Sequence, residues 1–239
     1  MLAADILTAW EQGRARTPTG RGQLLLAALG PGGAPSSALS VGQRDALLFD
    51  LRGELFGSGV EAVASCPGCA QQVELTFELD DVRARPPGDP TADLELVHDG
   101  YLVRARPPTA ADHAALEGVG SAAEGRELLL GRCVMAALRG GADVSPAELP
   151  ESVRVELASR MAEADPQADT RLVLTCPGCG RTWDATFDIV SFLWQELDTE
   201  ARRLVREVHG LAAAYGWSEA EILAMSSARR SLYLEMVRP

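Results

Sequence analysis

Hydrophobic and polar residues alternate strictly in two short segments of this chain. In residues 73–79 the apolar positions are Val, Leu, Phe and Leu, and they are separated by Glu, Thr and Glu. In residues 183–189 the apolar positions are Trp, Ala, Phe and Ile, and they are separated by Asp, Thr and Asp. A period of two is typical of a strand with one buried face. The pattern predicts two strands whose buried side chains include Phe77, Trp183 and Phe187 and whose exposed ones include Glu74, Glu78 and Asp184.

Apolar residues spaced by three and four positions indicate helices near both ends of the chain. Residues 3–14 form one such segment, and Ser40 is placed to cap a second that continues through Phe56. The last fifty residues are helical throughout, with shorter helices that begin at Ser218 and at Ser226 or Ser227. One apolar stripe in this region contains Leu193, Leu197, Leu204, Val208, Leu211 and Tyr215.

The region between the two alternating segments has its own turn and capping signals. Residues 94–98 and 101–106 flank Asp99-Gly100, a strong signal for a β-hairpin. Thr109 begins a short helix. A capping box at Ser121 predicts a helix to about Arg139, and a second box at Ser145 predicts another to about Ala164. Residues 171–175 are predicted to form the strand that leads into the second alternating segment.

Each alternating segment follows a Cys-Pro-Gly-Cys knuckle, and the two copies match at a constant offset of 110 residues. Two such knuckles supply four thiolates, the number that a closed tetrahedral zinc site needs. The Pro fixes φ and the Gly accepts a positive φ, so the loop should direct amide N–H groups at the first sulfur. The pattern predicts one structural zinc ion on Cys66, Cys69, Cys176 and Cys179. Iron, local disulfides and an empty site are the alternatives.

These elements together predict an α+β fold: a small antiparallel zinc-ribbon-like sheet with a β-hairpin insertion, surrounded by helices. We divide the chain into five segments. They are an N-terminal helical segment (1–58), the first knuckle and strand (59–80), the hairpin and helical insertion (81–169), the second knuckle and strand (170–190), and the C-terminal helices (191–239). A Gly/Pro loop at residues 30–35 and a Pro-rich linker at residues 85–90 connect parts of this arrangement.

Composition narrows the classes of function. The formal net charge is −12, and all 22 basic residues are arginine. A chain this acidic is repelled by nucleic-acid phosphates unless it has a strong basic patch. We expect no membrane partner, because no apolar run approaches the length of a membrane span. No signal peptide is apparent, so we expect a reducing cytoplasm, where paired cysteines more often hold metal than form disulfides.

Other residues capable of chemistry have simpler interpretations. Cys133 lies in an apolar helix and is expected to be a small buried residue and not a nucleophile. Asp165 and Asp169 fit a helix-ending turn better than a metal or hydroxyl site. His98 and His113 are dispersed. No glycine-rich phosphate loop, nucleophile elbow or zinc-protease motif is present, and no metal ligand position is left open, so we expect no enzymatic activity.

The second half of the chain resembles a known family. The resemblance rests on Asp165-Pro-Gln-Ala-Asp169, the second knuckle, residues 187–194 and residues 207–223, and it covers roughly residues 160–237. These segments are similar to the T-even-type phage baseplate proteins of the hub-assembly family and their relatives in bacterial contractile particles. The resemblance implies a structural or assembly role, chaperone-like in character, with other baseplate or tail proteins as partners. It implies no catalytic residues.

Aromatic and arginine side chains in the C-terminal helices are candidates for binding that partner, because these residue types are enriched at interfaces. The candidates are Trp194, Arg202, Arg206, His209, Tyr215, Trp217, Arg229, Arg230 and Tyr233. A solvated basic face is the simpler interpretation of Arg202, Arg206 and His209. The competing function is a zinc-ribbon regulator that binds nucleic acid or the transcription machinery, which the charge of −12 disfavours.

Overall fold

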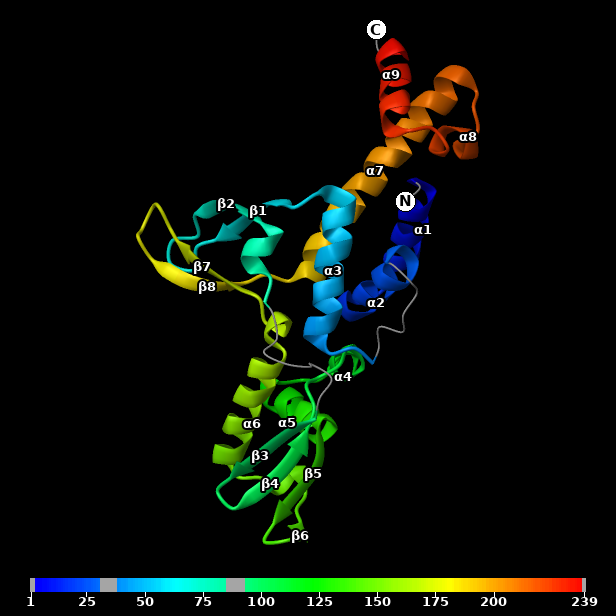
Figure 1. Cartoon of the computed structure of the whole chain (residues 1–239). Helices are drawn as coiled ribbons and strands as arrows, with labels where there is room; N and C mark the ends of the chain where they lie inside the picture. Colours follow the sequence, from blue (N-terminus) through cyan, green and yellow to red (C-terminus); the bar gives the residue numbers. More distant parts are fainter. Residues whose placement is uncertain (1–2, 31–37, 85–92, 238–239) are drawn as a thin grey trace. The chain divides into compact units, whose positions relative to one another are not determined.

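The computed structural model describes residues 3–30, 38–84 and 93–237, and the loop and linker expected at residues 30–35 and 85–90 lie largely outside this part. The chain folds as two compact units, Met1–Ala34 with Val190–Pro239 and Pro35–Ile189 (Figure 1). The N-terminal segment is therefore divided. Its first two helices belong with the C-terminal helices, and the helix that Ser40 caps belongs with the knuckles.

The secondary-structure elements of the first unit are all helices in its described residues. It contains α1 (Ala3–Gly13), α2 (Pro18–Leu29), most of α7 (Ile189–Tyr215), α8 (Glu219–Leu223) and α9 (Ser227–Val237). Leu7, Ala201, Leu204 and Leu223 form a buried cluster that joins α1, α7 and α8. The predicted C-terminal helices and the helix at 3–14 are confirmed. Helix α2 was not predicted, although its start carries the signal of Thr17 as N-cap followed by Pro18.

The second unit contains two separate two-stranded hairpins, which Figure 1 shows next to one another. Strand β1 (Gly59–Ser65) pairs with β2 (Gln72–Glu78), and β7 (Arg171–Thr175) pairs with β8 (Thr182–Thr186), both antiparallel. The alternation is confirmed, because Glu74, Glu78 and Asp184 are exposed. Phe77, Trp183 and Phe187 lie on the opposite, inner face but are only partly buried. Strand β1 was not predicted.

Helix α3 (Val41–Phe56) covers the inner face of the hairpins. Ser40 is the N-cap of this helix, as predicted, and it forms a reciprocal capping box with Gln43. Phe49 of α3 is fully buried and lies 6.0 Å, centroid to centroid, from Phe187, which in turn meets Phe77 edge-on at 5.4 Å. This aromatic row ties the helix to both hairpins.

The insertion between the hairpins has a four-stranded antiparallel sheet in the order β3-β4-β5-β6. Strands β3 (Leu94–His98) and β4 (Tyr101–Ala105) form the predicted hairpin, and Asp99 and Gly100 both have positive φ, as its tight turn requires. Helix α6 (Glu151–Ala164) packs on this sheet through Val153 and Leu157. Strand β6 (Ala142–Asp143) pairs with β5 and forms the edge of the sheet opposite to β3.

One predicted helix was too long. Helix α5 (Ala122–Cys133) starts at Ser121 as expected but ends at Cys133, and Val134–Arg139 forms strand β5. Pairing with β4 buries Val134 and Ala137 in the insertion core, and this long-range gain exceeds the weak helix preference of the segment. Gly140-Gly141, expected to stop a helix, instead makes the turn into β6 with both φ values positive.

Three short elements complete the insertion. Helix α4 (Ala110–Ala114) is capped by Thr109 as predicted. The box at Ser145 caps only a 3-10 turn, η2 (Pro146–Glu148), because Pro150 separates that turn from α6. Asp165 ends α6 and leads into a second 3-10 turn, η3 (Pro166–Ala168), so the expected helix-ending turn is confirmed. A further turn, η1 (Leu79–Val82), follows β2.

Candidate metal centre

The two knuckles are built by the same backbone hydrogen bonds. In the first, the N–H of Ala70 donates to the carbonyl of Cys66 at 2.9 Å, and the N–H of Cys66 donates to the carbonyl of Gln71 at 2.9 Å. In the second, Gly180 and Arg181 take the parts of Ala70 and Gln71 around Cys176, again at 2.9 Å for both bonds. The repeat seen in the sequence is therefore a repeat of structure, with each knuckle at the tip of its own hairpin.

The knuckles bring all four predicted cysteines together. Their Sγ atoms lie within 4.8 Å of one another. The Sγ atoms of Cys66 and Cys179 are 3.7 Å apart, and those of Cys69 and Cys176 are 3.6 Å apart. All four are free thiols. A tetrahedral ion with sulfur ligands at about 2.3 Å places those sulfurs about 3.8 Å apart. The four cysteines are therefore close enough together to hold one metal ion.

Each knuckle contributes one buried and one exposed sulfur residue. Cys66 and Cys176 are 2% and 1% exposed and pack with Val73, whereas Cys69 and Cys179 face solvent. Burial raises the pKa of the Cys66 thiol, but hydrogen bonds from the N–H groups of Gly68 and Cys69 and from the thiols of Cys179 and Cys176 lower that pKa to about 6. A backbone hydrogen bond at Gln71 lowers the pKa of Cys69, but its interactions with the thiols of Cys176 and Cys179 raise it to about 12. The N–H of Gly68 lies 3.4 Å from the Cys66 sulfur, as the sequence predicted. Such bonds stabilise the thiolate form that binds metal.

The glycines of the knuckles serve a different purpose from the one expected. Neither Gly68 nor Gly178 has a positive φ; the left-handed residues are Ala70, with φ of 60°, and Gly180, with φ of 72°. A Cβ on Gly178 would lie 1.8 Å from Oε1 of Gln71, so the glycine permits close approach of the opposite knuckle. Gln71 is a residue of the centre that sequence reasoning missed.

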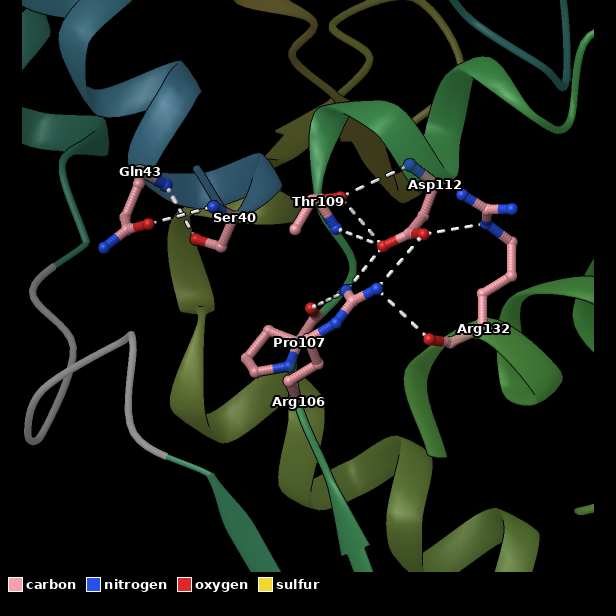
Figure 2. A network of polar contacts seen from close by, with 7 residues as sticks. All are labelled: Ser40, Gln43, Arg106, Pro107, Thr109, Asp112 and Arg132. Atoms are coloured by element: carbon pink, nitrogen blue, oxygen red, sulfur yellow. Dashed lines mark hydrogen bonds and ion pairs between the residues drawn. The ribbon is translucent and has the colours of Figure 1, made fainter. Parts of the chain in front are cut away.

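A second polar cluster, also missed, lies at the N-terminal end of α4. Asp112 is 1% exposed along its side chain and accepts hydrogen bonds from Arg106 at 2.5 Å and from Arg132 at 2.8 Å (Figure 2). Its Oδ2 also accepts from the N–H and the hydroxyl of Thr109, each at 2.9 Å. Burial opposes ionisation, but these bonds hold the pKa of Asp112 well below its usual range.

The residues next to this cluster contact the start of α3. Thr109 forms an antiparallel bridge with Ser40, and the N–H of Val41 donates to the carbonyl of Pro108 at 3.0 Å. Figure 2 shows Ser40 and Gln43, at the start of α3, beside Thr109. The cluster therefore fixes the start of α4 against the start of α3. Both arginines donate hydrogen bonds to this one carboxylate, Arg106 through Nη2 at 3.3 Å and Arg132 through Nε at 2.8 Å.

The other residues that the sequence analysis considered for chemistry are buried or paired with neighbouring groups. Cys133 is buried in the insertion core, and burial raises the pKa of its thiol to about 11, as a non-nucleophilic residue requires. Asp165 is buried and accepts a 2.8 Å hydrogen bond from the N–H of Gly42, which joins the turn after α6 to α3. Asp169 pairs with Arg171 on the surface, and His98 lies 3.6 Å from the Asp99 carboxylate.

The nine candidate partner-binding residues are not all on the surface. Trp194 is 8% exposed and packs against Gly13 and under Arg21, and Arg230 is 3% exposed and bonds Glu207 at 2.8 Å. These two side chains hold the first unit together. Arg202, Arg206, His209, Tyr215 and Arg229 are exposed. Tyr215, Trp217 and Tyr233 stack on one another, with ring centroids 4.4–5.6 Å apart, and so join α7 to α9.

Among the residues that the structure describes, no helix has the length and the apolar character that crossing a bilayer would need. No curated protein and no solved structure matches the chain. A family model, described as T4 bacteriophage base plate protein, matches residues 23–194. This range contains both hairpins and the whole insertion, and it ends within α7. The resemblance at residues 160–237 included the second hairpin but not the first hairpin or most of the insertion. Since the match covers well over half of the chain, the protein belongs to the T4-type phage baseplate protein family.

Proposed function

We propose that this protein is a non-enzymatic structural or assembly component of the baseplate of a contractile, phage-tail-like particle. The observation that carries the proposal is the family match over residues 23–194, which includes all four cysteines. Its partners are other baseplate or tail proteins. It acts in the cytoplasm, where such particles are assembled, and can be carried into the finished particle.

The metal at the centre is proposed to be zinc, one ion per chain, on Cys66, Cys69, Cys176 and Cys179. Four thiolates at tetrahedral spacing are the usual ligand set of structural zinc. With every position occupied by cysteine, no site remains for water or substrate, so the ion would stabilise the fold and not catalyse a reaction. It would hold together two hairpins that share no backbone ladder.

A regulator that binds nucleic acid is the weaker proposal. The net charge is −12, and 34 acidic residues face only 22 basic ones. Many of the arginines are already paired with carboxylates, as Arg202 is with Asp198 at 2.7 Å. Counterion release, the main source of affinity for nucleic acid, needs unpaired basic groups.

Deletion of the gene in the organism that makes the particle tests the proposal. Loss of the protein should leave tails without a complete baseplate when they are imaged by electron microscopy. A tagged copy that restores assembly then separates two roles: a permanent component co-purifies with finished particles, and a chaperone is found only with intermediates. Normal, fully assembled particles in the deletion strain would contradict the proposed function.

We further propose that the exposed part of the C-terminal candidates contacts a partner. Arg202 and Arg206 lie one turn apart on α7 and are both exposed. Truncation at residue 188 would remove most of the first unit, so charge reversal is the cleaner test. Arg202→Glu with Arg206→Glu should reduce recovery of baseplate proteins in a pull-down. Arg160→Glu, an exposed arginine of α6 with a similar ion pair, is the matched control.

A further inference from the structure

A groove of about 350 Å³ runs between the two hairpins. It is lined by residues 74–77 of β2, by Asp81 and Val82 after it, and by residues 172–174 of β7. No residue of β1 or β8 among those described lines it. The groove therefore lies along the outer edges of β2 and β7, where each strand has no ladder partner in the described structure.

The register shows which backbone groups point into this groove. The N–H of Leu79 donates to the carbonyl of Ser58, and that of Cys66 to the carbonyl of Gln71, so the hydrogen-bonded positions of β2 are 73, 75 and 77. Glu74 and Thr76 consequently turn their N–H and C=O groups away from β1. In the second hairpin the N–H of Phe187 donates to the carbonyl of Thr170, so the hydrogen-bonded positions of β7 are 172 and 174. Val173 therefore turns its N–H and C=O groups away from β8.

The side chains at this edge protect it only in part. Natural edges are usually blocked by charged side chains, Pro or a bulge, and Glu74 of β2 is one such charged residue. Val173 is instead 73% exposed at its edge, and no proline lies in either strand. An edge with free backbone groups and an exposed β-branched residue is suited to accept a further strand.

The charge of the residues that line the groove indicates what kind of strand it would bind. Glu74 and Asp81 line the groove, and none of the described lining residues is basic. Glu61, Glu78 and Asp184 extend the negative charge over the exposed faces of the same hairpins. A second copy of this chain would bring like charges together, which disfavours self-pairing. An extended segment with alternating apolar and basic residues would form hydrogen bonds with the free backbone groups. Its apolar side chains would pack against the apolar lining residues, and its basic side chains would pair with the acidic ones.

We propose that the β2–β7 groove binds an extended, basic segment of a partner protein as an added β-strand that bridges the two hairpins. This inference rests on the proposed function for the nature of the partner, a protein of the same particle. Because the knuckles hold the start of β2 beside the end of β7, the width of the groove depends on the metal centre.

The probes are two eight-residue peptides, one of alternating Val and Lys and one of alternating Val and Glu, titrated into the full chain. The Val/Lys peptide should bind at least tenfold more tightly than the Val/Glu peptide, with weaker binding at higher salt. It should slow amide hydrogen exchange at Glu74, Thr76 and Val173. Glu74→Arg should weaken binding at least tenfold. Glu163→Arg, which changes an exposed acid of α6 that does not line the groove, should not.

Several results would overturn the inference: no binding of the Val/Lys peptide, equal binding of both peptides, or unchanged binding by Glu74→Arg. A dimer of the free chain that Glu74→Arg dissolves would assign the groove to a second copy. Circular dichroism and metal content verify that both variants fold. The phenotype of the gene-deletion strain distinguishes a failure of the groove assignment from a failure of the proposed baseplate function. If the chain is needed for assembly but the peptides fail, only the groove assignment falls. If assembly is normal without the chain, the proposed function falls and the peptide data still decide the groove.

Discussion

Replacement of Cys69 by serine is expected to empty the metal centre and to destabilise the second unit. Cys69 is the suitable position because its side chain is exposed, so the change removes a ligand without opening a cavity in the core. The buried Cys66 and Cys176 would confound the loss of metal with a loss of packing. A drop in stability at Cys69 therefore reports on ligation itself.

The magnitude follows from the length of chain that the ion joins. Ligation connects residues 66 and 69 to residues 176 and 179, which closes a loop of about 110 residues. A crosslink of that span lowers the entropy of the unfolded chain by an amount equivalent to about 4–5 kcal/mol at 25 °C. Metal binding to the native state adds to the free energy of folding in the same sense. We expect Cys69→Ser to lower the free energy of unfolding by about 3–5 kcal/mol.

The assay combines elemental analysis with denaturant unfolding, with and without a chelator. Wild-type protein should carry one zinc per chain and should lose stability on chelation, whereas Cys69→Ser should carry none and should not respond to the chelator. Cys133→Ala, which removes a cysteine outside the centre, should keep its zinc. Metal-free wild-type protein, or a Cys69→Ser variant with unchanged zinc and less than about 1 kcal/mol of destabilisation, would refute the reasoning.

Three further predictions concern the second unit. Phe187→Ala should cost about 2 kcal/mol in denaturant unfolding, less than the 3–5 kcal/mol typical of a fully buried Phe, because the ring is only partly buried between Phe49 and Phe77; a neutral variant would show that this row is not formed. Asp112→Asn should cost about 2–4 kcal/mol at pH 7, since it leaves Arg106 and Arg132 without their charged partner, and an unchanged melting temperature would contradict this. Burial, with Asp188 and Asp165 nearby, raises the pKa of Asp45 to about 6 despite its bond to Arg44. The native state thus holds a proton that the unfolded state releases, so this group favours folding below about pH 4, and that contribution is lost as pH rises through 6. The stability of Asp45→Asn relative to wild type should rise by about 2–3 kcal/mol between pH 4 and pH 7, and parallel pH profiles would exclude the effect.

Elements defined by neighbouring residues could be predicted from the sequence. The knuckles, the turn at Asp99-Gly100 and the caps at Ser40, Thr109 and Ser218 are all confirmed. In each case the residue types themselves set the backbone angles or satisfy the first N–H groups of a helix. The four cysteines could also be grouped correctly, because the repeat at a constant offset marks them as one ligand set.

Pairings between distant residues could not be predicted. Residues 134–139 have an adequate helix pattern, and only the presence of β4 makes them a strand. Strand β1 has no strong pattern of its own and is defined by its ladder with β2. The row of Phe49, Phe77 and Phe187 and the carboxylate of Asp112 between two arginines likewise join parts of the chain that no local motif connects.

The sequence by itself therefore determined the grouping of the four cysteines, the local turns and caps, and the acidic character that disfavours nucleic acid. Tertiary structure decided which side chains remain on the surface. Trp194 and Arg230 have the residue types of a binding site, but the packing of α1 and the carboxylate of Glu207 bury them. It also decided that the outer edges of β2 and β7 line one groove. Backbone angles and metal affinity depend on a few adjacent residues, whereas burial and edge exposure depend on what the rest of the chain brings alongside.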